Sequence, residues 1–305
     1  MSVRALVVDP SATDAVRLTE VPEPVPGPGQ VLVDVHHVSL NHGDLNDALS
    51  GRVPEGAVLG SDAAGVVVRS EGPGPAVGTR VVALSAGAFA ERIAVDADAL
   101  AEIPDGLSPA EAAALPVAGI AALRSLRAGG LAPGKRVLVT GASGGVGRFA
   151  LQLAAAAGAH VIASVGSASR REGLVKAGAD EVVGLKGLDR PVDVIIDSVG
   201  GPQMVAAWEL LAPGGSLQSV GWTSGEPAVF PPYSTIGPAK SLTSFVNDLS
   251  APAADLALLV GYAAEGSLAV QIGWQGPWER FADAAQALRR RTVQGKAVLR
   301  VTATR

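Results

Sequence analysis

The sequence predicts an α/β protein in which a β-rich, barrel-like part is followed by a parallel-sheet part. Two observations lead to this fold class. Residues 1–100 contain short apolar runs separated by Gly, Pro and Ser, which is typical of strands and turns. From Lys135 onward, apolar runs alternate with stretches of helical character, and this alternation indicates βαβ units around a parallel sheet.

Individual elements follow from local patterns. In "VLVDVHHVSL", Val31, Val33 and Val35 fall on one face of an expected strand. Ser108 followed by Glu111 forms a capping box, so we expect a helix to begin there. Further strands are expected in "AAGVVVRS", "GTRVVALS", "FAERIAV", "RVLVTG", "HVIASVG", "EVVGL", "VDVIIDSVG", "SLQSVGW" and "GKAVLRVT", and further helices in "ADLALLVGYAAEG" and "ERFADAAQALRRR".

Composition excludes several classes of protein. The 305 residues suffice for one large domain or two ordinary ones, and the net charge of −5 comes without a run of like charges, so no nucleic-acid partner is expected. The absence of cysteine excludes disulfides, thiolate catalysis and Cys-ligated zinc. We find no signal peptide and no apolar span of roughly 18 residues. We therefore expect a cytoplasmic protein without a membrane partner.

The stretch "VLVTGASGGVG" predicts a dinucleotide-binding loop. Its glycines follow an expected strand and open an expected helix, where they permit a tight turn, close approach of a pyrophosphate and close packing of helix on sheet. A second expected strand, "HVIASV", follows the helix. The candidate cofactor-binding residues of this loop are Gly141, Ser143, Gly144, Gly145, Val146 and Gly147.

The residues after that second strand favour NADP(H) over NAD(H). A site for NAD(H) carries an acidic residue there to bind the ribose 2′-hydroxyl, but no carboxylate precedes Glu172 in "SVGSASRRE". Guanidinium and hydroxyl groups suit a 2′-phosphate. An alternative interpretation is that the arginines are solvated at the start of a helix. The candidate contacts are Ser164, Gly166, Ser167, Ser169, Arg170 and Arg171.

The motifs occur in a family-specific order: "LPVAGIAAL", "VLVTGASGGVG", "GAD", "DVIIDSVGG", "LAPGGSLQSVG" and "GKAVLRV". This series resembles the medium-chain dehydrogenase/reductase superfamily, and within it the zinc-free quinone oxidoreductases. The resemblance implies a GroES-like catalytic domain built from residues 1–117 and 266–305, around a Rossmann domain at 118–265. It places the nicotinamide between the domains, and further cofactor contacts are expected from Val199, Gly221 and Arg291.

The resemblance also predicts that the chain lacks a zinc site. Asn41 stands where zinc-dependent members carry a Cys, Ser61 and Asp62 replace their His-Glu pair, and Val117 takes the third ligand position. These side chains cannot make a zinc site. The histidines His36, His37, His42 and His160 lack metal-ligand spacing, and we interpret them as ordinary histidines, with His42 the one that could contact substrate.

Without a metal, hydrogen-bond donors must polarise the substrate carbonyl, which favours acceptors activated by conjugation. The resemblance places the Asn-x-x-Asp motif, here Asn41 and Asp44, near the nicotinamide. Asn41 is the candidate donor and Asp44 orders the loop, although both can instead cap a turn. Tyr233 in "FPPYST" is a further catalytic candidate, with packing or surface exposure as its alternative; Trp222 and Trp274 are other possible donors.

Three departures from the family pattern affect the pocket. Ala121 replaces a Thr, no aromatic residue follows the Asn-x-x-Asp motif, and "VGLKGLDRPVDV" is too short for the helix that usually precedes the next strand.

The leading function is NADPH-dependent reduction of a quinone or an α,β-unsaturated carbonyl compound. One alternative is a tailoring reductase or dehydrogenase acting on one biosynthetic intermediate, and another is a non-catalytic NADPH-binding sensor or structural protein. We expect a homodimer, because the Rossmann sheet has an edge to cover and "SLTSFVND", residues 241–248, is a plausible edge strand.

Overall fold

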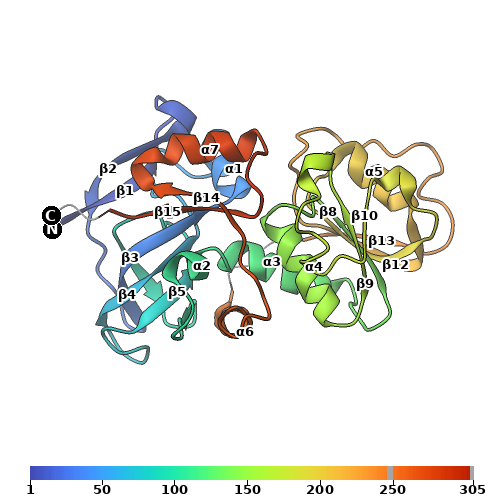
Figure 1. Cartoon of the computed structure of the whole chain (residues 1–305). Helices are drawn as coiled ribbons and strands as arrows, with labels where there is room; N and C mark the ends of the chain where they lie inside the picture. The colour runs from blue at the N-terminus through green and yellow to red at the C-terminus, as the bar shows by residue number, and fades with distance from the viewer. Residues whose placement is uncertain (246–249, 303–305) are drawn as a thin grey trace. The chain divides into compact units, whose positions relative to one another are not determined.

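The structure is a computed structural model that describes residues 1–245 and 250–302 (Figure 1). The chain divides into two compact units. We call Met1–Ile120 with Asp248–Arg305 the N/C unit, and Ala121–Asn247 the middle unit. The sequence led us to expect boundaries after residues 117 and 265; the compact units change at 120 and 247, so helix α6 (Ala253–Ala264) groups with the N/C unit.

A seven-stranded sheet forms the centre of the N/C unit. Its strand order is β14-β15-β3-β4-β5-β7, with β6 also paired to β3. All pairs are antiparallel except β14 with β15, and β1 and β2 form a separate antiparallel pair. The strands are β1 (Ser2–Val8), β2 (Val16–Pro22), β3 (Gln30–Leu40), β4 (Asp62–Ser70), β5 (Arg80–Leu84), β6 (Arg92–Asp96), β7 (Leu100–Glu102), β14 (Ile272–Pro277) and β15 (Lys296–Arg300).

Apolar side chains on this sheet form the core of the N/C unit. Val31, Val33 and Val35 of β3 are all buried, as the alternating pattern predicted. The predicted capping box is confirmed, because the Glu111 N–H donates to Ser108 Oγ at 3.2 Å and the Ser108 N–H to Glu111 Oε2 at 3.1 Å. The helices are η1 (Thr13–Ala15), α1 (His42–Ser50), α2 (Pro109–Ala113), α6, η4 (Trp278–Arg280) and α7 (Phe281–Arg289).

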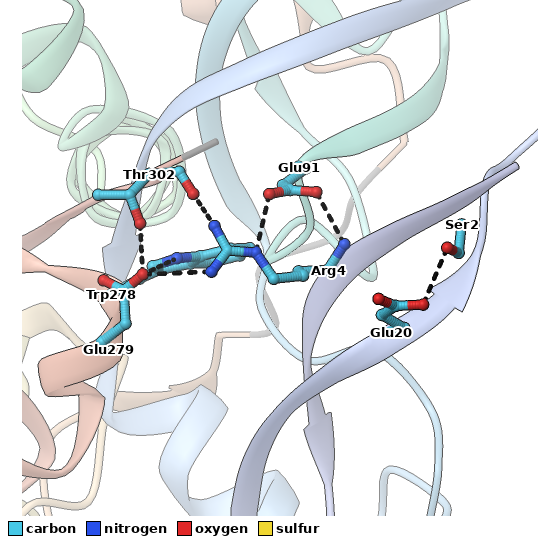
Figure 2. A network of polar contacts seen from close by, with 7 residues as sticks. All are labelled: Ser2, Arg4, Glu20, Glu91, Trp278, Glu279 and Thr302. Atoms are coloured by element: carbon cyan, nitrogen blue, oxygen red, sulfur yellow. Dashed lines mark hydrogen bonds and ion pairs between the residues drawn. The ribbon is translucent and has the colours of Figure 1, made fainter. Parts of the chain in front are cut away.

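Polar contacts join the two chain segments of the N/C unit (Figure 2). Arg4 on β1 donates through Nε to Glu91 Oε1 at 3.0 Å, and through its other guanidinium nitrogens to Glu279 and to the Thr302 carbonyl. The Arg4 guanidinium also lies 5.4 Å from the centre of the Trp278 ring. In Figure 2 these residues form one continuous network, beside a separate Ser2–Glu20 contact. The network fixes the C-terminal segment against β1.

The middle unit contains the predicted parallel sheet. Its order is β10-β9-β8-β11-β12-β13, and every adjacent pair is parallel. The strand order reverses between β8 and β11, which is the point where open α/β sheets bind ligands. The strands are β8 (Arg136–Thr140), β9 (His160–Ser164), β10 (Glu181–Val183), β11 (Val192–Asp197), β12 (Leu211–Ser219) and β13 (Ser241–Ser244).

Helices connect some strands of the middle unit, and turns connect others. The helical elements are α3 (Pro116–Ala128, which begins in the N/C unit), α4 (Gly145–Ala156), α5 (Gly201–Glu209), η2 (Ala168–Arg170) and η3 (Leu185–Gly187). Between β9 and β10 the chain forms η2 and turns rather than the expected helix, consistent with its Ser and Gly content and with positive φ at Gly173 and Gly178. Only η3 separates β10 from β11, which confirms the predicted short connection.

The predicted edge strand is confirmed for Ser241–Ser244, since β13 pairs with β12 at the end of the sheet; 246–248 of the predicted segment lie outside the described residues. Within the described ranges, no helix has the length and apolar character needed to cross a bilayer. Together these elements confirm the predicted fold class: a β-rich unit formed by both chain segments and a doubly wound parallel sheet.

Candidate cofactor and active sites

The glycine loop connects β8 to α4 and permits only glycine at a critical position. Gly141 has φ of 61°, and its carbonyl accepts the Gly144 N–H at 2.9 Å. A Cβ atom on Gly147 would lie 2.5 Å from the Gly141 oxygen and 2.7 Å from Ala142 Cα. The first turn of α4 therefore packs directly on the loop. Because the first N–H groups of a helix lack partners within the helix, Gly145 and Val146 offer donors to an anion here.

The carboxyl ends of β8 and β11 are tied together beside this loop. Thr140 Oγ1 donates to Asp197 Oδ1, and the Gly200 N–H donates to Asp197 Oδ2 at 2.8 Å. Burial raises the pKa of the Asp197 carboxyl above its ordinary value. Asp197 was not predicted as a site residue, although an Asp at the end of an apolar strand in "VIIDSVGG" was a usable signal.

Three other predicted contacts lie at the same edge of the sheet. A Cβ on Gly141 would lie 3.3 Å from Val199 Cγ2, which places Val199 against the loop. Gly221 follows β12, and its N–H donates to the Asp197 carbonyl at 3.2 Å. Ser164, at the end of β9, accepts the Ala142 N–H through its carbonyl at 3.2 Å.

The basic segment after β9 reaches the glycine loop. Arg170 Nε donates to Ser143 Oγ at 2.8 Å, and the hydroxyl oxygens of Ser167 and Ser169 lie 3.0 Å apart. Arg171 turns toward β10 and donates to the Val182 carbonyl. A hollow of about 140 Å³ lies at the same ends of β9 and β10, lined by Val165, Gly166, Ser167, Ala168, Arg171, Val183 and Gly184.

A third guanidinium, which the sequence analysis missed, lies next to this segment. Arg148 in the first turns of α4 donates through Nη2 to the Glu172 carbonyl at 3.1 Å. Burial and then the charge of Arg170 lower the pKa of Arg148. An arginine near a helix N-terminus opposes the helix dipole, and this unfavourable placement was the available signal.

These groups fit a nicotinamide dinucleotide. The glycine cradle leaves no room for a Cβ at Gly147, the helix N-terminus suits a pyrophosphate, and the residues lining the hollow include a guanidinium but no carboxylate. Two other predicted residues belong neither to the glycine loop nor to the segment after β9. Arg291 follows α7 in the N/C unit with φ of 57°, and Tyr233 is 80% exposed in a loop of the middle unit.

A buried polar cluster lies in the N/C unit, where β15, β3 and β4 are neighbours. Strand register brings its members together, since Ala297 pairs with Leu40 and Ser39 pairs with Asp62. Asn41 and Asp44 lie at the start of α1, directly after β3. We call the following group the Asp62 cluster: Asn41, Asp44, Ser61, Asp62 and Lys296.

Asp62 is the centre of this cluster. One carboxylate oxygen, Oδ1, accepts the Val117 N–H at 2.9 Å. The other, Oδ2, accepts Asn41 Nδ2 at 2.9 Å and Lys296 Nζ at 3.2 Å. Lys296 Nζ also donates to Asn41 Oδ1. Lys296 was not predicted as a site residue, because its partners are more than two hundred positions away and no local pattern reports them.

Asp44 joins the cluster through Asn41 and Ser61. Its Oδ2 accepts the Asn41 N–H at 2.7 Å and its Oδ1 accepts Ser61 Oγ at 3.4 Å. Asn41 is the N-cap of α1, so the capping role considered for this pair is present. Burial, followed by the charge of Asp62, raises the pKa of Asp44 to about 7. Burial also raises the pKa of Asp62, against the opposing charge of Lys296.

The cluster has buried charges and a more accessible rim. Asp44, Asp62 and Lys296 are all buried, whereas Asn41 and Ser61 are half-buried. Asn41 and Ser61 are therefore the members of the cluster with the most exposed surface. His42, the next residue after Asn41, is also half-buried.

Comparisons with known proteins agree with both units. Residues 27–105 match the family model described as alcohol dehydrogenase GroES-like domain, and residues 145–260 match the one described as zinc-binding dehydrogenase. Bovine prostaglandin reductase-3 is 37% identical over 236 residues, covering 72% of this chain and 62% of that protein. The chain belongs to the medium-chain dehydrogenase/reductase superfamily.

A further match shows the range of this superfamily. A mycocerosic acid synthase-like polyketide synthase of Mycolicibacterium smegmatis is 34% identical over 240 residues, covering 72% of this chain. The chain spans only 11% of that synthase. The match is therefore to one segment of a much longer protein.

Solved structures of the superfamily have the same fold. A quinone oxidoreductase from Pseudomonas syringae pv. Tomato has a TM-score of 0.87 and 26% identity, covering 98% of this chain and all of that one. A mycobacterial protein solved with NADPH has a TM-score of 0.85 and 26% identity, covering 98% and 99% of the two chains. These neighbours support the quinone-reductase-like branch predicted from the motifs.

The superfamily's metal positions have a different chemistry in this chain. Asn41, Ser61 and Val117 occupy the three positions that the resemblance assigned to zinc ligands. Asn41 and the Val117 N–H instead bind the Asp62 carboxylate, and Ser61 contacts Asp44. Among residues 1–245 and 250–302, no group of three or more His, Asp or Glu side chains is placed to hold a metal ion.

Proposed function

We propose that the protein is a zinc-independent, NADPH-dependent reductase of quinones or α,β-unsaturated carbonyl compounds. The observation that carries this proposal is the 2.8 Å hydrogen bond from Arg170 Nε to Ser143 Oγ. It holds a guanidinium group of the segment after β9 against the glycine loop, where the ribose next to a bound pyrophosphate would lie. A 2′-phosphate there would meet positive charge.

Different residues of the middle unit would bind different parts of NADPH. The N–H groups at the start of α4 would hold the pyrophosphate, and Val199 and Gly221 line the same edge of the sheet. Arg170, Arg171, Ser167 and Ser169 would hold the 2′-phosphate through charge-assisted hydrogen bonds. When bound, NADPH supplies the hydride; the protein binds, orients and excludes water.

The Asp62 cluster supports a conjugated acceptor as substrate. Without a metal, negative charge that develops on a substrate oxygen must be met by fixed donors. Asn41 Nδ2 has one strong acceptor, Asp62 Oδ2 at 2.9 Å, and one long contact to the Ser39 carbonyl at 3.3 Å. The second hydrogen is held weakly, so it is the one that a substrate oxygen would take.

The names of the relatives agree with this substrate class, because they include a quinone oxidoreductase and a prostaglandin reductase. A second function is favoured by the polyketide synthase match, in which a segment like this chain is one part of a longer protein. We therefore retain, as an alternative, a reductase dedicated to one biosynthetic intermediate. Turnover of 9,10-phenanthrenequinone or a simple enone with NADPH favours the first function; turnover of neither favours the second.

Cofactor preference is the sharpest test. We expect the unaltered protein to bind NADPH much more tightly than NADH. Arg170→Ala should weaken NADPH binding by one to two decades, since a charge-assisted contact is worth about 1.5–3 kcal/mol, and should leave NADH binding nearly unchanged. Both dissociation constants are measurable by calorimetry or by nucleotide fluorescence.

Arg190→Ala is the matched control. Arg190 is also an exposed arginine of the middle unit, but it precedes β11 and so lies at the opposite edge of the parallel sheet from the glycine loop. This variant should bind both nucleotides as the unaltered protein does. Equal affinities for NADPH and NADH in the unaltered protein would refute the cofactor assignment.

A further inference from the structure

Lys296 brings a positive charge into the Asp62 cluster at the first position of β15. Its side chain is only 4% exposed, and its ammonium group contacts two different partners. One is the Asp62 carboxylate at 3.2 Å, and the other is the carbonyl oxygen of the Asn41 amide. An ammonium group has three N–H donors, and the Asn41 oxygen accepts one that the ion pair with Asp62 leaves over.

The contacts of Asn41 distinguish the two ends of its amide. The oxygen faces an ammonium group, which can only donate, and the nitrogen faces a carboxylate, which can only accept. A rotation of the amide by half a turn would place donor against donor and acceptor against acceptor. Lys296 and Asp62 together therefore allow one orientation, in which the second N–H points away from both.

We propose that Lys296 is a positioning residue that acts through Asn41, fixing and polarising the amide so that its weakly held N–H faces the substrate oxygen. This inference rests on the proposed function. A cation bound to the amide oxygen withdraws electron density from the nitrogen, so the N–H becomes a stronger donor. The charge of Lys296 thus acts on the substrate through one amide.

A purely structural role for Lys296 makes different predictions. In that role, its ammonium only neutralises Asp62 and joins β15 to β4, and its loss would lower stability without a specific effect on the chemical step. The positioning role requires that the effect of Lys296 on kcat depends on Asn41. A double-mutant cycle separates the two, because residues that act through one another are not additive.

The experiment uses the full chain and four proteins: unaltered, Lys296→Met, Asn41→Ala and the double variant. With NADPH and 9,10-phenanthrenequinone, Lys296→Met should lower kcat by about tenfold to a hundredfold per folded molecule, the value of one charge-assisted hydrogen bond. The NADPH dissociation constant should stay unchanged. In the Asn41→Ala background, the same substitution should lower kcat no further. Lys296→Arg should restore part of the loss.

Two further variants guard against a trivial result. Lys135→Met breaks an ion pair of the same 3.2 Å length in the middle unit, and it should leave kcat unchanged. If Lys296→Met does not fold, Asp62→Asn with Lys296→Met removes both charges together and leaves no uncompensated ion. Its kcat should fall to the level of Asn41→Ala, while NADPH binding, measured without substrate, persists.

The results distinguish the inference from the function on which it rests. An unchanged kcat in Asn41→Ala would show that Asn41 is not the donor, and it would also overturn this inference. A reduced kcat in Asn41→Ala combined with a normal one in Lys296→Met overturns the inference alone. Equal loss from Lys296→Met in both backgrounds also overturns it, because Lys296 would then act independently of Asn41.

Discussion

At the scale of single residues, Asp44 is a buried carboxyl group whose surroundings change its acidity. It is buried at the start of α1, where it accepts the Asn41 N–H and contacts Ser61. The charges that face it are those of Asp62 and Lys296. Burial and the charge of Asp62 raise its pKa to about 7, so the folded protein favours the protonated acid where an unfolded chain would be ionised.

This raised pKa predicts that stability falls as the pH rises. The folded pKa lies above the ordinary value of 3.8, so the stabilising effect of protonation is complete below about pH 4 and is lost as the pH passes through about 7. The slope should reach about 1.4 kcal/mol per pH unit at most. Asp44→Asn should reduce the dependence of the free energy of unfolding on pH, as measured by denaturant unfolding between pH 4 and 8.

Asp47→Asn provides the comparison for that measurement. Asp47 lies on the same helix, but its side chain is 40% exposed and pairs with Arg52. Its replacement should leave the slope of stability against pH as it is in the unaltered protein. If the two variants have the same slope, the buried carboxyl of Asp44 is not the source of the pH dependence.

Some site residues could be predicted from the sequence, and others could not, for a physical reason. The glycines of the loop and the Ser108 cap act through neighbours a few positions away, so local patterns contain them. Lys296 acts on Asn41 and Asp62 through the register of β15, β3 and β4, which no local pattern encodes. Asn41 and Asp44 were predicted as candidates from the sequence, but the buried ammonium group of Lys296 was not.

At the scale of elements, strand β13 forms one edge of the parallel sheet. Among the residues that the structure describes, it pairs with β12 alone, and Ser241–Ser244 are all exposed. Exposed edge strands pair readily with another chain. The sequence predicted this edge strand. Strands were predicted better than connections: the Ser- and Gly-rich residues after β9 form turns where a helix was expected.

We expect β13 to pair with its copy in a homodimer. Leu242→Lys should convert the dimer to a monomer, since a charged side chain on an edge strand opposes pairing. Light scattering at micromolar concentration would measure the change. Val229→Lys replaces another exposed apolar residue of the middle unit and should leave the dimer intact. A monomeric unaltered protein would contradict this expectation.

At the scale of the whole molecule, the chain keeps the superfamily fold with a different set of residues at the metal positions. The matching family model is described as a zinc-binding dehydrogenase, yet the chain has no cysteine. Asn41 and the Val117 N–H donate hydrogen bonds to the Asp62 carboxylate instead. The fold is set by many apolar contacts, whereas a metal site depends on three or four side chains. The two can therefore change separately.

We expect turnover to be independent of metal. Elemental analysis of the purified protein should find no stoichiometric zinc, and a chelator should leave both NADPH consumption and the melting temperature unchanged. The reason is that amide, hydroxyl and aliphatic groups do not replace thiolate and imidazole as zinc ligands. Tightly bound zinc whose removal abolishes activity would contradict the proposed function.

The N/C unit is discontinuous, and this has a consequence for the order in which the protein is made. Strands β3 and β4 are synthesised before the middle unit, but β15 is synthesised only after all of it. Lys296 meets Asp62 across 234 positions of sequence. Until it arrives, two carboxyl groups lack the ammonium that balances them. Because domains generally fold as units during synthesis, the middle unit can fold before the N/C unit is complete. A nucleotide-binding loop in the middle unit would thus form before Lys296 reaches the Asp62 cluster.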